Sequence, residues 1–168
     1  DRDWSSDVCS SDLRFNGTGG AWTLTDTNAT TTGAFTVASG TVTLPSGNLG
    51  VGRNFENLGG TIVHNNAKLI MMATSSANLG TLGSSLYSVT FTGAGPFSMT
   101  DANVTLLDSL TMATGTLTLA TGTVAVGGNF LIATGTVMHA SGTVILNAPA
   151  VGKVVTVGTN ALSNLVVG

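Results

Sequence analysis

The chain has little charge, few aromatic residues and a single cysteine. Charged residues make up 8% of the 168 residues, far below the roughly 25% of a typical soluble domain. No basic cluster is present to neutralise phosphates, so nucleic-acid binding is not expected. No run of about 18 apolar residues exists, so no membrane-spanning helix is predicted. The scarcity of cysteine is compatible with an exported bacterial protein.

Residues that favour helices are also scarce, because Glu, Lys, Gln and Arg are almost missing. Gly, Thr, Val, Ala, Leu, Ser and Asn take their place. Thr and Val favour strands, whereas Gly and Asn favour tight turns. The composition therefore predicts an all-β fold with many turns.

The first residues differ from the rest of the chain. The run Asp3–Leu13, DWSSDVCSSDL, reads as the uninterrupted translation of a common sequencing adapter. We therefore expect residues 1–13 to be an adapter-derived or disordered tail that is not part of the fold. Cys9 belongs to this tail, and the charges that remain sum to zero. An adapter joined to a reading frame also indicates a fragment, so the lack of a signal peptide is uninformative.

The dominant signal is a long internal repeat. Asp101–Gly158 aligns with Asp26–Gly83, and 21 of the 58 positions are identical without a gap. Flanking segments match with one further residue of offset, as for Val89 and Leu165, and a third copy begins near the end of the chain. The period that separates Asp26 from Asp101 is called the 75-residue period below. Periods of this length indicate a stacked repeat architecture.

A shorter, 20-residue period lies inside each unit, as the spacing of Gly95, Gly115 and Gly135 shows. Between these glycines, short stretches alternate apolar side chains with threonine. Such alternation buries one face of a short strand. The outward set is expected to be Thr116, Thr118, Thr123, Thr136 and Thr143. The inward set is expected to be Leu117, Leu119, Val124, Val126, Phe130, Ile132, Val137, Val144 and Leu146.

Three short strands in each 20-residue period predict a β-solenoid, whose coils pair with the coils above and below at about 4.8 Å. We expect about seven or eight coils and a rod about 35 Å long. Residues 14–89 form one repeat unit, and residues 90–168 form a second unit with the start of a third. A longer excursion is expected over Asn147–Asn160. The alternative is two tandem β-sandwich repeats, although sandwich strands are usually longer than those expected here.

The run Gly115–Leu146, with its Gly-Thr-Leu-Thr-Leu, Gly-Thr-Val and Gly-Asn-Phe segments, resembles repeats of bacterial surface proteins. These are the filamentous-haemagglutinin-like adhesins and the autotransporter passenger stalks. The segment Gly93–Leu117 is similar to the autotransporter-associated β-strand repeat. The resemblance covers nearly all of residues 14–168 and rests mainly on turn glycines and strand threonines. It implies a right-handed β-helix at the cell surface, but such repeats need not have a 75-residue period.

Neither histidine is predicted to bind a metal. His64 and His139 occupy equivalent repeat positions. In a solenoid they would lie on the order of 18 Å apart, too far to share an ion. No cofactor site is predicted either.

The aspartates are interpreted as structural. Asp26 and Asp101 each begin an Asp-x-Asn turn, in which side chains bond nearby backbone amides. Asp101 and Asp108 could approach the spacing of about 5–10 Å that glycosidase carboxylates need. However, Gly33 stands at the position equivalent to Asp108, so no catalytic residue is predicted.

The sequence therefore favours a non-catalytic structural or adhesive stalk segment of a secreted, extracellular protein. Its expected partners are glycans or other cell surfaces, together with further copies bound through open solenoid ends. A carbohydrate-active or carbohydrate-binding β-helix is the alternative. Ice binding through the Thr-x-Thr pairs Thr41/Thr43 and Thr116/Thr118 is a lesser alternative.

Overall fold

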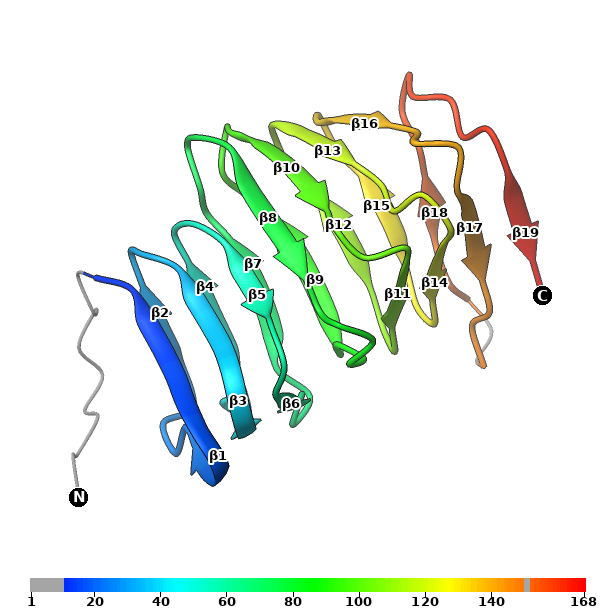
Figure 1. Ribbon diagram of the computed structural model, residues 1–168. Coiled ribbons are helices and arrows are strands. Elements are labelled where there is room, and N and C mark those ends of the chain that lie inside the picture. The colour runs from blue at the N-terminus through cyan, green and yellow to red at the C-terminus, as the bar shows by residue number, and fades with distance from the viewer. Residues whose placement is uncertain (1–10, 150–151) are drawn as a thin grey trace.

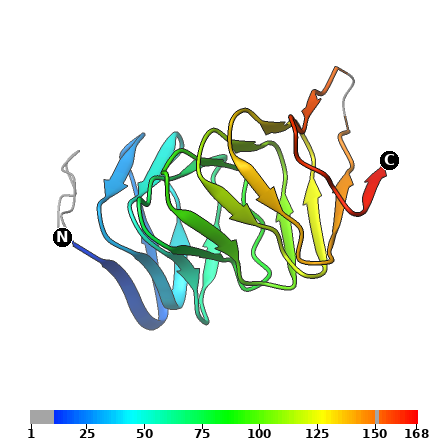
Figure 2. The ribbon, with the colours of Figure 1, turned by 90° about the horizontal axis from the view of Figure 1, so that it is seen from above.

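A computed structural model describes residues 11–149 and 152–168. Within these two stretches the chain forms strands, turns and bends and contains no helix. No described segment is therefore a helix able to cross a membrane. The strands stack into a rod, with β1 (Leu13–Thr23) and β19 (Leu165–Val167) at opposite ends (Figures 1 and 2). The all-β prediction is confirmed.

The strands form three faces that run along the rod. Face A is a seven-stranded sheet: β2 (Ala29–Thr31), β4 (Asn48–Val51), β7 (Lys68–Met71), β9 (Ser88–Phe91), β12 (Leu110–Met112), β15 (Phe130–Ile132) and β18 (Val155–Thr156). Face B begins with β1 and continues through β3 (Phe35–Thr43), β5 (Phe55–Asn57), β8 (Ala77–Gly80), β10 (Pro96–Met99), β13 (Thr116–Thr118) and β16 (Thr136–Met138).

Face C is built differently in the two halves of the rod. In the first coils it consists of the second halves of β1 and β3, followed by β6 (Thr61–Val63). A single bridge between Leu86 and Leu106 then leads into a four-stranded sheet. That sheet contains β11 (Asn103–Leu106), β14 (Thr123–Val126), β17 (Thr143–Leu146) and β19.

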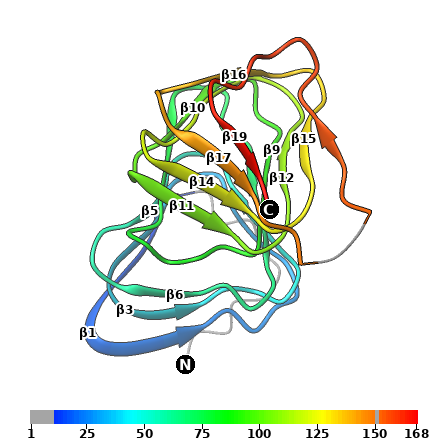
Figure 3. The same ribbon diagram turned by 90° about the vertical axis from the view of Figure 1, so that its right-hand side faces the viewer.

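The chain visits faces A, B and C in turn, which makes a solenoid of about eight coils. Every pair among the described strands is parallel. Figure 3 looks along the axis from the side of β19, and the chain turns counterclockwise as it comes toward the viewer. The solenoid is therefore right-handed, the usual hand for crossovers between parallel strands. Parallel pairing rules out the two antiparallel sandwiches.

The 20-residue period sets the register between strands of successive coils. Phe97 pairs with Leu117, which pairs with Val137, so each ladder step advances the chain by one period. Longer coils occur where a corner is extended. Phe130 pairs with Val155 rather than with a residue one period away, which matches the excursion expected over Asn147–Asn160.

The core is the inside of the coil and holds one row of apolar side chains from each face. All nine residues predicted to point inward are buried, and the five threonines predicted to point outward are not. Aromatic rings stack along the axis in the first coils. The Phe35 ring lies 5.4 Å from that of Phe15 and 5.2 Å from that of Phe55. Phe35 and Phe55 are ladder partners, so their rings stack in parallel, whereas Phe15 pairs with Val37 and its ring meets that of Phe35 at a tilt.

The 75-residue repeat is not a whole number of coils. β4 and β7 on face A correspond to β14 and β17 on face C, and β5 on face B corresponds to β15 on face A. One repeat therefore spans eleven strand positions, which is three coils and two further faces. Equivalent residues are displaced by one face, about 120° around the axis, and by about 18 Å along it.

Glycine at the corners makes this close stacking possible. Gly40 and Gly115 are repeat equivalents with φ values of 81° and 86°. A Cβ at Gly40 would lie 2.6 Å from the carbonyl oxygen of Gly17, and one at Gly115 would lie 2.7 Å from that of Gly93. The repeat therefore retains glycine where the backbone is left-handed and another backbone lies against it.

The start of the fold differs slightly from the predicted tail of residues 1–13. β1 begins at Leu13, whose amide donates to Ala34 O at 2.7 Å, and Asp12 Oδ1 accepts from Ala34 N at 2.8 Å. Residues 11–13 contact the first coil because the edge of β3 that faces away from β5 offers its backbone groups for pairing. The rest of the predicted tail, residues 1–10, lies outside the described residues. The boundary between residues 89 and 90 falls inside β9, so the repeat units are continuous in the stack.

Replacement of Phe35 by alanine tests the axial core. The side chain is fully buried between two other rings, so Phe35→Ala should lower the free energy of unfolding by about 3–5 kcal/mol. Thr61→Ala, at an exposed position of β6, should lower it by less than about 1 kcal/mol. Urea unfolding followed by circular dichroism measures both changes, and equal losses would contradict this packing.

Candidate functional site

The carboxylates do not form a catalytic pair. Asp101 precedes β11 and Asp108 follows it, so the two residues lie at opposite corners of face C. An extended strand covers about 3.3 Å per residue, which separates them far beyond the spacing that glycosidases use. The expectation that the two carboxylates could approach this spacing was wrong, because Asn103–Leu106 forms a strand between them.

Asp101 holds a turn of the preceding coil. Its Oδ2 accepts hydrogen bonds from the backbone amide and the Oγ1 of Thr81 and from the amide of Leu82. That turn contains two left-handed residues, Leu82 with φ 49° and Gly83 with φ 77°. The carboxylate of Asp101 therefore stabilises a left-handed turn.

The asparagines of the Asp-x-Asn segments act between coils. Asn28 Oδ1 accepts from the amide of Asn48 at 2.8 Å, and its repeat equivalent Asn103 accepts from the amide of Thr123 at 3.0 Å. The expected bonds within one turn were therefore wrong for these side chains. Each side chain bonds the next coil instead, because that coil lies only one ladder step away.

Asp108 has a looser environment. Its Oδ1 lies 3.9 Å from Lys153 Nζ, and its Oδ2 accepts from Ser109 Oγ at 3.1 Å. The two charged side chains remain about one-third exposed. Such a pair contributes little to stability.

The two histidines lie on different faces, as the displacement of the repeat requires. His64 follows β6 on face C, whereas His139 follows β16 on face B. Both ring nitrogens of His139 are buried without a hydrogen-bond partner. The ring of His64 stacks on that of Tyr87, with centroids 6.0 Å apart. Residues 11–149 and 152–168 contain no cluster of three metal-ligating side chains.

The two Thr-x-Thr pairs also lie on different faces. Thr41 and Thr43 belong to face C, whereas Thr116 and Thr118 belong to face B. On face B, Thr118 is followed in the next coil by Met138. The pairs therefore do not combine into one flat threonine array, which ice binding would require.

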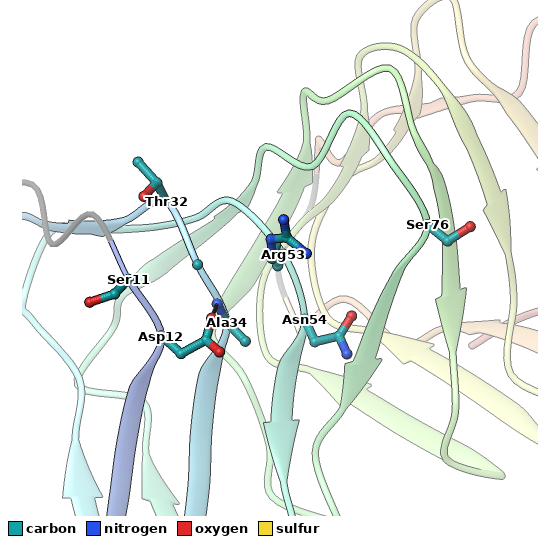
Figure 4. A pocket seen from close by; sticks show the side chains of 8 residues that line it. Ser11, Asp12, Thr32, Ala34, Arg53, Asn54 and Ser76 are labelled. Atoms are coloured by element: carbon teal, nitrogen blue, oxygen red, sulfur yellow. Dashed lines mark hydrogen bonds between the residues drawn. The ribbon is translucent and has the colours of Figure 1, made fainter.

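A shallow polar groove lies at the corner between faces A and B (Figure 4). Arg53 and Asn54, from the turn after β4, lie between Asp12 and Ser76 of the neighbouring coils. Thr32, Gly33, Ala34 and Ser11 complete its lining. Asp12 Oδ1 accepts a hydrogen bond from Ala34 N, and Asn54 Oδ1 accepts one from Asn78 N at 3.0 Å.

The groove offers one guanidinium group and several hydroxyl and amide groups. It can bond a polar ligand, but the side chains that line it include no histidine, cysteine or pair of carboxylates. Sequence reasoning missed this groove. Its residues are 11–12, 32–34, 53–54 and 76, and only the stacking of coils brings them together.

No protein-family model, curated protein or solved structure matches the chain.

Substitution of the two aspartates separates a structural carboxylate from a surface one. Asp101→Ala removes three hydrogen bonds from the turn at Thr81–Gly83 and should lower the free energy of unfolding by about 1–3 kcal/mol. Asp108→Ala loses a partly exposed ion pair and the bond from the neighbouring Ser109 Oγ, and should cost less than about 1 kcal/mol. Thermal unfolding of both variants measures the difference. A larger loss for Asp108→Ala would contradict the assigned roles.

Proposed function

We propose that this solenoid is a non-catalytic segment of an extracellular stalk that makes adhesive contacts with glycans or other cell surfaces. The observation that carries the proposal is the parallel stacking of about eight coils, whose ladders are continuous on faces A and B. A ladder of this kind makes a stiff rod, because every coil is bonded to the coils on either side. Stiffness and length are the properties that a stalk needs.

The surface of the rod supports adhesion by many weak contacts. Outward side chains on the strands are mostly threonine, serine and asparagine, with few charges. Hydroxyl and amide groups donate and accept hydrogen bonds without bringing formal charge. These groups match the hydroxyls of neutral glycans.

The displaced repeat gives this surface a further property. Because each 75-residue unit is turned by one face, equivalent corners recur on successive sides of the rod. The two units thus present related strands on two different faces of the rod, as β4 on face A and β14 on face C show. Such a design favours a multivalent contact over a single oriented site.

Binding to glycan-coated surfaces tests the proposal. The labelled chain should bind a surface bearing mixed neutral polysaccharides or whole cells, and periodate oxidation of the sugars should remove most of that binding. The heat-unfolded chain serves as the control. Under the same conditions, acidic polysaccharides should yield no new reducing ends. If the wild-type chain does cleave these polysaccharides and Asp101→Ala or Asp108→Ala abolishes the cleavage, the function is catalytic rather than adhesive.

Self-association is a second expected property of this polypeptide. The last coil leaves apolar side chains uncovered, with Leu165 and Val167 45% and 72% exposed. Unpaired strand edges of this kind join readily to other strands. Val167→Lys should therefore reduce the fraction of large species in sedimentation velocity, whereas Thr136→Lys on the side of the rod should not. A wild-type chain that stays monomeric at high concentration would contradict this expectation.

A further inference from the structure

We propose that the stacked rings of His64 and Tyr87 form a contact site for a neutral carbohydrate. The inference rests on the proposed adhesive function and names one site and one ligand class for it. His64 immediately follows β6, and Tyr87 immediately precedes β9. Both residues lie at the corner between faces C and A. Their ring planes are inclined by 21°, with centroids 6.0 Å apart.

This corner differs from the rest of the described chain in displaying aromatic rings. All six phenylalanines are buried in the core. Tyr87 is the one tyrosine of the chain, and both it and His64 are partly exposed. Trp22 is also partly exposed, but its ring packs over Gly17, Gly20 and Gly40. The pair is thus an aromatic surface that the core does not use.

Both rings keep free hydrogen-bonding capacity. His64 Nδ1 accepts from the amide of Asn66 at 3.0 Å, which leaves Nε2 available. Neither this Nε2 nor Tyr87 Oη has a hydrogen-bond partner among the described residues. Among the described residues, the buried side-chain nitrogens and oxygens without a partner are the two ring nitrogens of His139. His64 Nε2 and Tyr87 Oη are therefore reached by solvent, which a ligand can replace.

A rigid turn holds the site in place. Ala67 N donates to His64 O at 2.7 Å, and the two central residues, Asn65 and Asn66, have φ values of 47° and 59°. Two consecutive left-handed residues define a type I′ turn, which asparagine tolerates. Asn65 Nδ2 donates to Leu44 O at 3.0 Å and fastens the turn to the preceding coil. Asn66 is exposed and is held next to the imidazole by its backbone amide, which donates to His64 Nδ1.

The chemistry of the corner selects a neutral sugar. The face of an aromatic ring is electron-rich, and it attracts the polarised C–H groups on the flat side of a pyranose. Hydroxyl groups around the sugar then meet Tyr87 Oη, His64 Nε2 and the Asn66 amide. Asp108, whose amide donates to Tyr87 O, has its carboxylate paired with Lys153. Lys68, exposed at the start of β7, pairs with Ser88 next to Tyr87, and a ligand without charge does not need its ammonium group.

The second repeat unit lacks this site. His139 is retained, but Ser163 replaces Tyr87, because this flank carries the further residue of offset that aligns Val89 with Leu165, and Ala140 and Ser141 replace the two asparagines. Without a second ring or the amide groups, the equivalent corner has nothing with which to hold a sugar face. The chain is therefore expected to carry one such site rather than one per repeat.

Affinity electrophoresis tests this site with named ligands. Gels containing galactomannan, mixed-linkage glucan or polygalacturonate should retard the wild-type chain in at least one neutral polysaccharide. Tyr87→Leu, which removes the aromatic ring but keeps an apolar side chain, should weaken that retardation about tenfold. Tyr87→Phe keeps the ring and should retain most of the binding. Leu58→Ala, an exposed position at the corner between faces B and C, should bind like the wild type.

The outcomes distinguish the site from the general function. Thermal unfolding first establishes that each variant is folded. If the chain binds polysaccharides or cells and Tyr87→Leu binds equally well, the site is wrong and the adhesive function stands. If only polygalacturonate retards the chain, the neutral ligand class is wrong. If the wild type binds no glycan and no cell surface, the adhesive function itself fails.

Discussion

Hydrogen bonding between successive coils is the constraint on which the rest of this structure depends. Each coil leaves its backbone groups pointing along the axis, and only another backbone about 4.8 Å away can satisfy a whole row of them. The 20-residue register, the short strands and the close-packed corners follow from this requirement. Where no strand is available, a side chain replaces one. Asn160 Oδ1 accepts from Val137 N at 2.7 Å, and its Nδ2 donates to Gly135 O at 3.2 Å, as a paired strand would.

The same constraint explains why asparagine is placed at the corners. Asn54 and Asn129 are repeat equivalents, and each accepts a hydrogen bond from a backbone amide of the next coil, that of Asn78 and that of Val154. The buried Asn57 bonds Gly60 O, Thr81 O and two amides of its own turn. At a corner the strands separate, so an amide side chain satisfies backbone groups that the ladder cannot reach. These polar residues serve the fold, which leaves few for a binding site.

The proposed function follows from regularity, and the proposed ligand site follows from a departure from it. Stacked coils with hydroxyl and amide groups on three faces suit a stiff, multivalent stalk. At the corner of His64 and Tyr87, the first unit has a tyrosine where the second has Ser163, and Asn-Asn where the second has Ala140-Ser141. In the equivalent corner the histidine nitrogens are buried. Two copies of one segment have therefore taken different surroundings because each lies on a different face.

The sequence by itself determined the strand content, the coil length and the identity of the core. Alternation within a short segment such as Thr123–Val126 indicates which side chains point inward, because a strand has a period of two. It did not determine the faces. The 75-residue period reveals a repeat but not that the repeat covers eleven strand positions, since the length of each corner is set by packing. Only the tertiary structure decided that Asp101 and Asp108 are separated by a strand and that His64 and Tyr87, from successive coils, stack on each other. The physical reason is that residues at a corner become neighbours through coil stacking, and a small change in the length of a turn alters which side chains meet.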